Sequence, residues 1–212
     1  GTSAPQTLSV TVSNPQPAQP GAITGNTNPC PGTEAYSIGA VTNATSYTWT
    51  VSGGGTITGT GTSATVNWTT SGGPYQVSVI ATNACGNSTA QTITVTVQPS
   101  PTAPSIITSG DTICEGQSAT ITATGSTGGA ITYNIYPTQT GGTSLGVSPF
   151  TVSPTVTTTY YVEAINDLGC RYSGGRVPVT IVVSPAPSAP VITSGDEGVC
   201  FNESTVLTAT TS

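Results

Sequence analysis

The stretch APSIITSGDTIC, residues 103–114, decides how this chain is organised, because it occurs three times. It returns almost unchanged as APVITSGDEGVC at residues 189–200, and more loosely as QPGAITGNTNPC at residues 19–30. The copies end in Cys30, Cys114 and Cys200, which are 84 and 86 residues apart. Self-similarity at a fixed period indicates tandem repeats, and this segment opens each repeat.

A second phrase recurs with the same period and marks the end of each repeat. QTLSVTV at residues 6–12 returns as QTITVTV at 91–97 and as VPVTIVV at 177–183, and prolines follow each copy. Alternating apolar and polar residues predict a strand, and proline ends a strand and stiffens the connector after it. We therefore expect the last strand of a preceding domain in residues 1–14, whole domains in 15–99 and 100–186, and the first strands of a further domain in 187–212.

Within the two whole domains, short alternating runs are separated by Gly-rich turns. These runs predict strands at residues 34–41, 45–51, 63–70, 74–82 and 91–97, and at residues 118–124, 131–137, 149–153, 157–165 and 177–183. One apolar face per run is typical of half-buried antiparallel strands, and no useful helical periodicity occurs. The predicted fold class is all-β, with tandem antiparallel β-sandwiches forming an extended rod.

The composition excludes several classes of function. The chain has 212 residues, two cations (Arg171 and Arg176), eight carboxylates, no His and a net charge of −6. This balance argues against nucleic acid and anionic membrane surfaces, which need basic patches. No apolar run reaches the roughly 18 residues of a membrane span, so we expect no membrane insertion. Only 5% of the residues are charged, so solubility must come from hydroxyl and amide groups.

The residues needed for catalysis are missing from the sequence. Without His or Lys there is no base to activate a Ser or Cys nucleophile. The carboxylate pairs are Asp111 with Glu115, Glu163 with Asp167, and Asp196 with Glu197, and we interpret them as turn-forming or solvated acids. Arg171, close to Asp167, and Arg176 are expected to form ordinary ion pairs. We predict no catalytic residue, no cofactor and no enzymatic activity.

Four of these acids are weak candidates for calcium. Asp111, Glu115, Asp196 and Glu197 lie near the predicted domain junctions. Calcium takes six to eight oxygen ligands, several of them from carboxylates in one compact loop. The EF-hand and cadherin-like spacings are absent, so simple turn residues are the preferred interpretation.

Both domains resemble known families. GGTSLG at 141–146, TTTYYVEAINDLGC at 157–170 and the arginine before VPVTIVV resemble the Ig-like repeats of Bacteroidetes-type secreted surface proteins. SYTWTVSGG at 46–54, ATVNW at 64–68 and VSVIATNACGNS at 77–88 resemble the PKD-like repeats found beside them. Ile135 stands where the Ig-like repeats usually carry a core Trp, so that core must pack differently.

The resemblance implies a structural or adhesive segment of a long cell-surface filament, exported by the type IX system and used in attachment or gliding motility. The alternative is a spacer or carbohydrate-binding module of a secreted polysaccharide-degrading enzyme. The expected location is extracellular or at the cell surface, secreted or outer-membrane-anchored. Expected partners are neighbouring repeats of the same chain, surface polysaccharide and other filament proteins. Asp111-Thr112-Ile113 also resembles a short bacterial O-glycosylation pattern, which makes Thr112 a candidate acceptor.

Five cysteines without a His suit disulfides in an oxidising compartment. Spacing alone favours one bond per domain, Cys30–Cys85 and Cys114–Cys170. Ig-like topology would put Cys114 and Cys170 near opposite ends of a sandwich roughly 30 Å long, beyond the Cα separation of about 7 Å that a disulfide tolerates. An inter-domain Cys30–Cys170 bond avoids this problem and leaves Cys85 and Cys200 for other domains. Both pairings stay open, with the inter-domain one slightly favoured, and free thiols are the third alternative.

Overall fold

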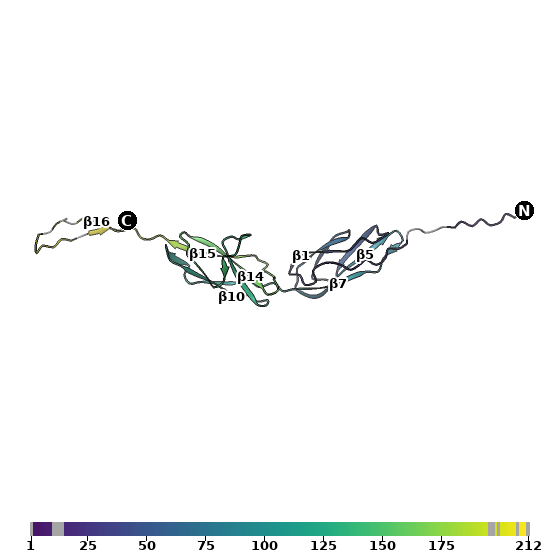
Figure 1. The fold of residues 1–212 in the computed structure, drawn as a ribbon, viewed down its shortest axis with the longest axis horizontal. Helices are drawn as coiled ribbons and strands as arrows, with labels where there is room; N and C mark the ends of the chain where they lie inside the picture. The colour runs from purple at the N-terminus through teal and green to yellow at the C-terminus, as the bar shows by residue number, and fades with distance from the viewer. Residues whose placement is uncertain (1, 10–14, 195–197, 199, 207, 211–212) are drawn as a thin grey trace.

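The computed structural model describes residues 2–9, 15–194, 198, 200–206 and 208–210, and every regular element in them is a β-strand. The strands form two β-sandwiches that follow one another along the chain, and a short strand pair comes after them (Figure 1). The predicted all-β fold class is therefore confirmed. The described residues contain no helix long and apolar enough to cross a membrane.

The first sandwich is built from two antiparallel sheets. One sheet has the order β1-β4-β3, from β1 (Gly32–Ser37), β4 (Ser63–Trp68) and β3 (Gly55–Thr58). The other is centred on β5 (Gly72–Asn83), which pairs with β2 (Ser46–Val51), β6 (Gly86–Asn87) and β7 (Gln91–Val97). β3 and β6 were not predicted, because neither short segment carries an alternating apolar pattern.

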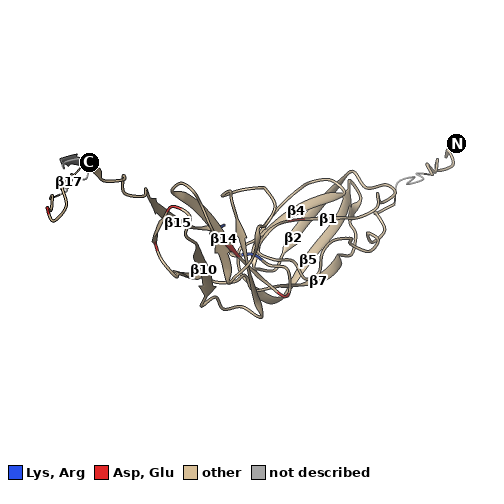
Figure 2. Ribbon diagram, turned by 60° about the vertical axis from the view of Figure 1, so that its left-hand side comes forward, with Lys and Arg blue, Asp and Glu red and all other residues tan. Residues whose placement is uncertain are grey.

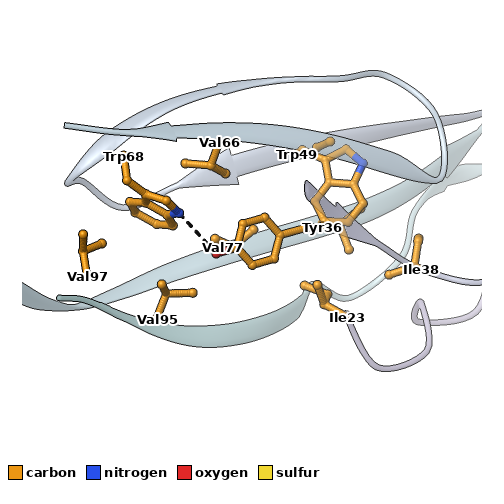
Figure 3. Close-up of a cluster of buried hydrophobic side chains, with 11 residues drawn as sticks. Ile23, Tyr36, Ile38, Trp49, Val66, Trp68, Val77, Val95 and Val97 are labelled. Carbon is orange, nitrogen blue, oxygen red and sulfur yellow. Dashed lines mark hydrogen bonds between the residues drawn. The ribbon is translucent and has the colours of Figure 1, made fainter. Parts of the chain in front are cut away.

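Aromatic side chains organise the core of the first sandwich (Figure 3). Trp68 packs edge-on against Tyr36 and stacks on Tyr75, with ring centroids 6.4 and 5.7 Å apart. The Trp68 indole N–H donates to the Tyr36 hydroxyl, 3.2 Å away, and this hydroxyl donates to the carbonyl of Asn26 at 2.9 Å. The polar atoms of both buried rings therefore have partners, which burial requires.

The second sandwich also has two sheets. The smaller has the order β13-β10-β8, from β13 (Phe150–Val152), β10 (Ala119–Thr124) and β8 (Ser105–Thr108). The larger has the order β12-β11-β14-β15-β9, from β12 (Gly146–Val147), β11 (Ile131–Tyr136), β14 (Thr158–Asn166), β15 (Val177–Ser184) and β9 (Thr112–Cys114). Ile135 is fully buried in the core between them, together with Ile121, Val162 and Ile181.

The segment that opens each repeat, named here the Pro-to-Cys segment, crosses from one sheet to the other in both sandwiches, at residues 19–30 and 103–114. In the second, β8 pairs antiparallel with β10, and after a bend β9 pairs in parallel with β15. In the first, Thr24 bridges to Ser37 of β1. The carbonyls of Thr27 and Pro29 then accept from the N–H groups of Thr96, within β7, and Gln98, just after it. The segment therefore adds to the edge of both sheets of its domain and ends beside the last strand.

The flanking segments contain less regular structure. Residues 2–9 form no strand, because no described strand lies beside them, and the rest of the predicted strand at 6–12 lies outside the described residues. After the second sandwich, β16 (Val191–Ser194) pairs antiparallel with β17 (Thr208–Thr210).

Candidate functional site: the joint between the two sandwiches

A disulfide between Cys30 and Cys170 joins the two sandwiches. The Cα atoms are 5.4 Å apart, although 140 positions separate the residues in sequence. Cys170 is fully buried, whereas Cys85, Cys114 and Cys200 are exposed and unbonded. Of the two pairings that the sequence left open, the structure has the inter-domain one, and neither intra-domain bond is formed.

The crossing of the Pro-to-Cys segment explains how Cys30 reaches the joint. The carbonyl of Pro29 accepts from the Gln98 N–H at 2.8 Å, so Cys30 lies beside the exit of β7. Cys170 lies at the facing end of the second sandwich, in the tight turn after β14. In this turn the N–H of Gly169 donates to Asn166 and the N–H of Asn166 donates to the carbonyl of Cys170. Residues 166–169 thus form a tight turn.

The side chain of Asn166 holds the connector against this turn. Its amide nitrogen donates to the carbonyls of Pro99 and Gly128, each 2.9 Å away. Its amide oxygen accepts from the N–H groups of Cys170 at 2.8 Å and Leu168 at 3.2 Å. Asn166 is buried, and these bonds satisfy both ends of its side chain. The connector and Cys170 are thus positioned by one residue.

The first sandwich contains an equivalent asparagine. The amide nitrogen of Asn83 donates to the carbonyl of Pro15 at 2.9 Å and to that of Asn43 at 3.0 Å. Its oxygen accepts from the Cys85 N–H at 2.8 Å. Each domain therefore binds the connector that enters it. Sequence reasoning gave neither asparagine this role, although each is the last residue of the longest strand of its domain and lies shortly before a turn glycine.

An open cleft of about 760 Å³ lies where the two sandwiches meet. Hydroxyl groups and prolines from both domains and the connector form much of its lining, with Tyr172 on the side of the second domain. The lining residues are Pro31, Gly32, Trp68, Thr69, Ser71, Ser100, Pro101, Thr102, Ala103, Tyr172 and Ser173. Because Trp68 is buried, Tyr172 is the aromatic side chain that this cleft can present to a ligand.

Arg171 and Arg176 follow β14 in the second sandwich, where Figure 2 draws them in blue, and they share one acidic partner. Both pair with Glu163, which is buried and also accepts from the Tyr136 hydroxyl at 3.2 Å. The hydrogen bond to Glu163 raises the pKa of Arg171 above its ordinary value. The guanidinium of Arg176 lies 3.3 Å from the centre of the Tyr136 ring.

The expected ion pairs are therefore present, but Asp167 does not take part in them. Ile165 bridges to Arg171, and Glu163 lies two residues before Ile165, on the same face of β14. Asp167 lies in the exposed turn instead. The interpretation as turn-forming or solvated acids therefore holds for Asp167 but is wrong for Glu163, which is buried and ion-paired within β14, and the two do not form a pair of catalytic carboxylates. Arg176 also donates to the carbonyls of Thr138 and Gly141, at 2.8 and 2.7 Å, and so holds the loop between β11 and β12.

The calcium candidates do not converge in the described part of the chain, where no three His, Cys, Asp or Glu side chains form a possible metal site. The carboxylate of Asp111 accepts a hydrogen bond from the Thr108 hydroxyl at the bend between β8 and β9, as expected of a turn residue. Glu115 is exposed just after β9, and Asp196 and Glu197 lie outside the described residues. Thr112 is exposed on β9, and its glycosylation stays a prediction.

Each sandwich is similar to a known domain family. A model described as a PKD-like domain matches residues 16–95, and one described as an Ig-like domain, CHU_C associated, matches residues 101–185. Both are families of structural domains rather than catalytic ones. No curated protein matches the chain.

Three solved structures also resemble the chain at low identity. The FN1-FN3 domains of chicken CNTN1 are 17% identical, over 92% of this chain and 76% of that one, with a TM-score of 0.32. The eight N-terminal Ig domains of Down Syndrome Cell Adhesion Molecule are 15% identical over 78% and 24%, with a TM-score of 0.36. A two-domain fibronectin type-III segment of chicken tenascin is 16% identical over 76% and 96%, with a TM-score of 0.33. At such TM-scores the likeness carries no argument about function.

Proposed function

We propose that this chain, which joins a PKD-like domain to an Ig-like domain, forms a load-bearing, adhesive segment of a long cell-surface filament. The observation that carries this proposal is the Cys30–Cys170 bond across the joint. A filament that holds a cell on a surface must transmit tension through many domains in series. A covalent bond between neighbouring domains serves that purpose.

The position of the bond determines how tension passes through the chain. A pull on the two ends enters the first domain before Cys30, crosses the disulfide to Cys170 and leaves through β15. The connector and most strands of both domains lie in the loop closed by the disulfide, outside this covalent path. Unfolding of a domain therefore lengthens the filament little while the disulfide is intact.

The chemistry of the surface suits an extracellular location. A structural disulfide persists in oxidising compartments, which supports a location outside the cell, secreted or anchored at the outer membrane. Hydroxyl and amide groups dominate the surface, because only 5% of the residues are charged. Such a surface has little charge for salt to screen, so it can hold polar surfaces such as polysaccharide, or neighbouring filament proteins, at varied ionic strength. Export by the type IX system and a use in gliding motility belong to this proposal.

Single-molecule stretching of the 212-residue chain between its ends tests the load-bearing role. The loop spans a sequence separation of 140, which at about 3.5 Å per extended residue hides roughly 490 Å of chain. We expect the oxidised chain to stop short of full extension by this length. The reduced chain and Cys170→Ser should both extend by the full length. Cys85→Ser, which removes an unbonded thiol, is the matched control. Equal final lengths with and without reductant would show that the bond carries no load.

The second candidate function is a spacer or carbohydrate-binding module of a secreted polysaccharide-degrading enzyme. The cleft at the joint supports it, since Tyr172 and the surrounding hydroxyls suit a sugar ring. A glycan array probed with the whole chain separates the two proposals. Tyr161 lies in β14 and does not line the cleft, so Tyr161→Ala is the control. Selective binding that Tyr172→Ala abolishes and Tyr161→Ala preserves would favour the carbohydrate module, whereas weak binding to many polar glycans would favour the filament.

A further inference from the structure

Cys114 occupies the same place in the second domain that Cys30 occupies in the first. In the first domain the carbonyl of Thr27, three residues before Cys30, accepts from the N–H of Thr96 at 2.9 Å. In the second domain the carbonyl of Asp111, three residues before Cys114, accepts from the N–H of Val182 at 2.9 Å. Both cysteines therefore end a segment that runs parallel to the last strand of its domain.

The chain that leaves the second domain repeats the first joint, and this is a second, independent observation. Val97-Gln98-Pro99-Ser100-Pro101 leaves the first domain, and Val183-Ser184-Pro185-Ala186-Pro187 leaves the second with the same spacing of prolines. Cys114 is level with Ser184 in the parallel ladder, just as Cys30 is next to the residue bonded to Gln98. The thiol of Cys114 is exposed at this exit and unbonded.

We propose that Cys114 forms an inter-domain disulfide with a turn cysteine of a like domain placed directly after this one. The partner is a cysteine thiol in the turn that follows the long strand of that domain. It lies close to a buried asparagine that binds the connector, as Cys170 lies close to Asn166. The disulfide at the first joint is then one member of a series that links successive domains. This inference rests on the geometry of the joint and does not need the adhesive role.

The bond forms by a balanced two-electron oxidation. The two thiols lose two protons and two electrons as the sulfur–sulfur bond forms. A disulfide oxidant, such as an oxidised thiol–disulfide oxidoreductase or oxidised glutathione, accepts the electrons and leaves as two thiols. The attacking group is a thiolate, so the exposure of Cys114 favours the first exchange step.

The test is the full chain with a second copy of residues 101–186 inserted after Ala186. The junction reads Val183-Ser184-Pro185-Ala186-Pro101, the same length as the first joint. Three of the five cysteines are unbonded in the original chain, and the insertion adds two more, Cys114 and Cys170 of the copy. After oxidation with a glutathione disulfide buffer, we expect the number of free thiols to remain three and a linked Cys114–Cys170 peptide to appear. Five free thiols would overturn the proposal.

One variant makes this test specific, and a folding measurement accompanies it. Cys170→Ser in the inserted copy should release the first Cys114 and remove the linked peptide, while Cys30–Cys170 remains. A Cys114–Cys170 peptide that survives this change would be an intra-domain bond and would also overturn the proposal. Hydrogen exchange of β14 reports whether the copy is folded. The two copies of β14 contribute equally to this measurement, so protection of only half of the amides means that one copy is unfolded. In that case the junction is rebuilt with Gln98-Pro99-Ser100 from the first joint and the free thiols are counted again.

Discussion

The amide nitrogen of Asn166 donates to the carbonyl of Pro99, 2.9 Å away, and so ties the connector to the turn that carries Cys170. One buried side chain thus fixes where the chain enters the second domain and where the disulfide leaves it. Asn83 holds Pro15 in the same way at the entrance to the first domain. The joint therefore combines a hydrogen-bonded clamp, which recurs in both domains, with a covalent bond.

Replacing Asn166 by Ala should destabilise the second domain strongly. The buried N–H of Cys170 loses its acceptor, which costs about 1–3 kcal/mol, and the part-buried bonds to the carbonyls of Pro99 and Gly128 are lost as well. We expect a loss of at least about 2 kcal/mol in the free energy of unfolding, measured by urea denaturation. Asn67→Ala, at an exposed position of β4, is the control and should change it by less than about 0.5 kcal/mol. Equal effects of the two changes would contradict the clamp.

Replacing Tyr36 by Phe should destabilise the first domain by about 1–3 kcal/mol, because the buried indole N–H of Trp68 loses its acceptor. The tryptophan fluorescence transition in urea measures this loss. Tyr75→Phe is the matched control, since it keeps the ring that stacks on Trp68. If the control lost as much stability as Tyr36→Phe, the hydroxyl of Tyr36 would not be the cause.

The stability of both domains should fall at alkaline pH. Burial raises the pKa of Tyr36 above its ordinary value of 10.0, although the hydrogen bond from Trp68 lowers it, and burial also raises the pKa of Tyr160. The unfolded chain therefore loses these protons at lower pH than the folded chain. The contribution of these two tyrosines to the free energy of unfolding is fully present below about pH 10. It is lost as the pH rises through their pKa values in the folded chain. Urea midpoints measured from pH 7 to 11.5 test this, and Tyr36→Phe should flatten the decline for the first domain.

Arg176→Lys should loosen the loop between β11 and β12, although it preserves the charge. Lysine cannot reproduce the planar group that lies over Tyr136 and bonds to the carbonyls of Thr138 and Gly141. Hydrogen exchange of residues 137–145 should rise at least tenfold. The side chain of Arg171 is 57% exposed, against 10% for Arg176, so Arg171→Lys is the control and should leave this loop protected. Unchanged hydrogen exchange in Arg176→Lys would show that the Arg176 side chain does not hold this loop.

Much of the fold could be predicted from alternation alone. Val77, Val79 and Ala81 of β5 are buried where their period of two places them, and the same holds for Val162 and Ala164 of β14. The short strands β3 and β12 could not be predicted, because pairing with a longer neighbour, rather than their own sequence, makes them strands. The two asparagines were missed for a similar reason, since their partners lie 67 and 68 residues away.

The sequence by itself determined the repeats, the β-sandwich fold and the set of cysteines. It did not determine their pairing, because spacings of 55 and 56 residues suit a bond within each domain as well as one between domains. Only the tertiary structure decided this. The Pro-to-Cys segment crosses to the last strand and brings Cys30 to the exit of its domain, 5.4 Å from Cys170 between Cα atoms. A disulfide tolerates a Cα–Cα separation of up to about 7 Å. The bond therefore forms between the two cysteines at the facing ends of the sandwiches.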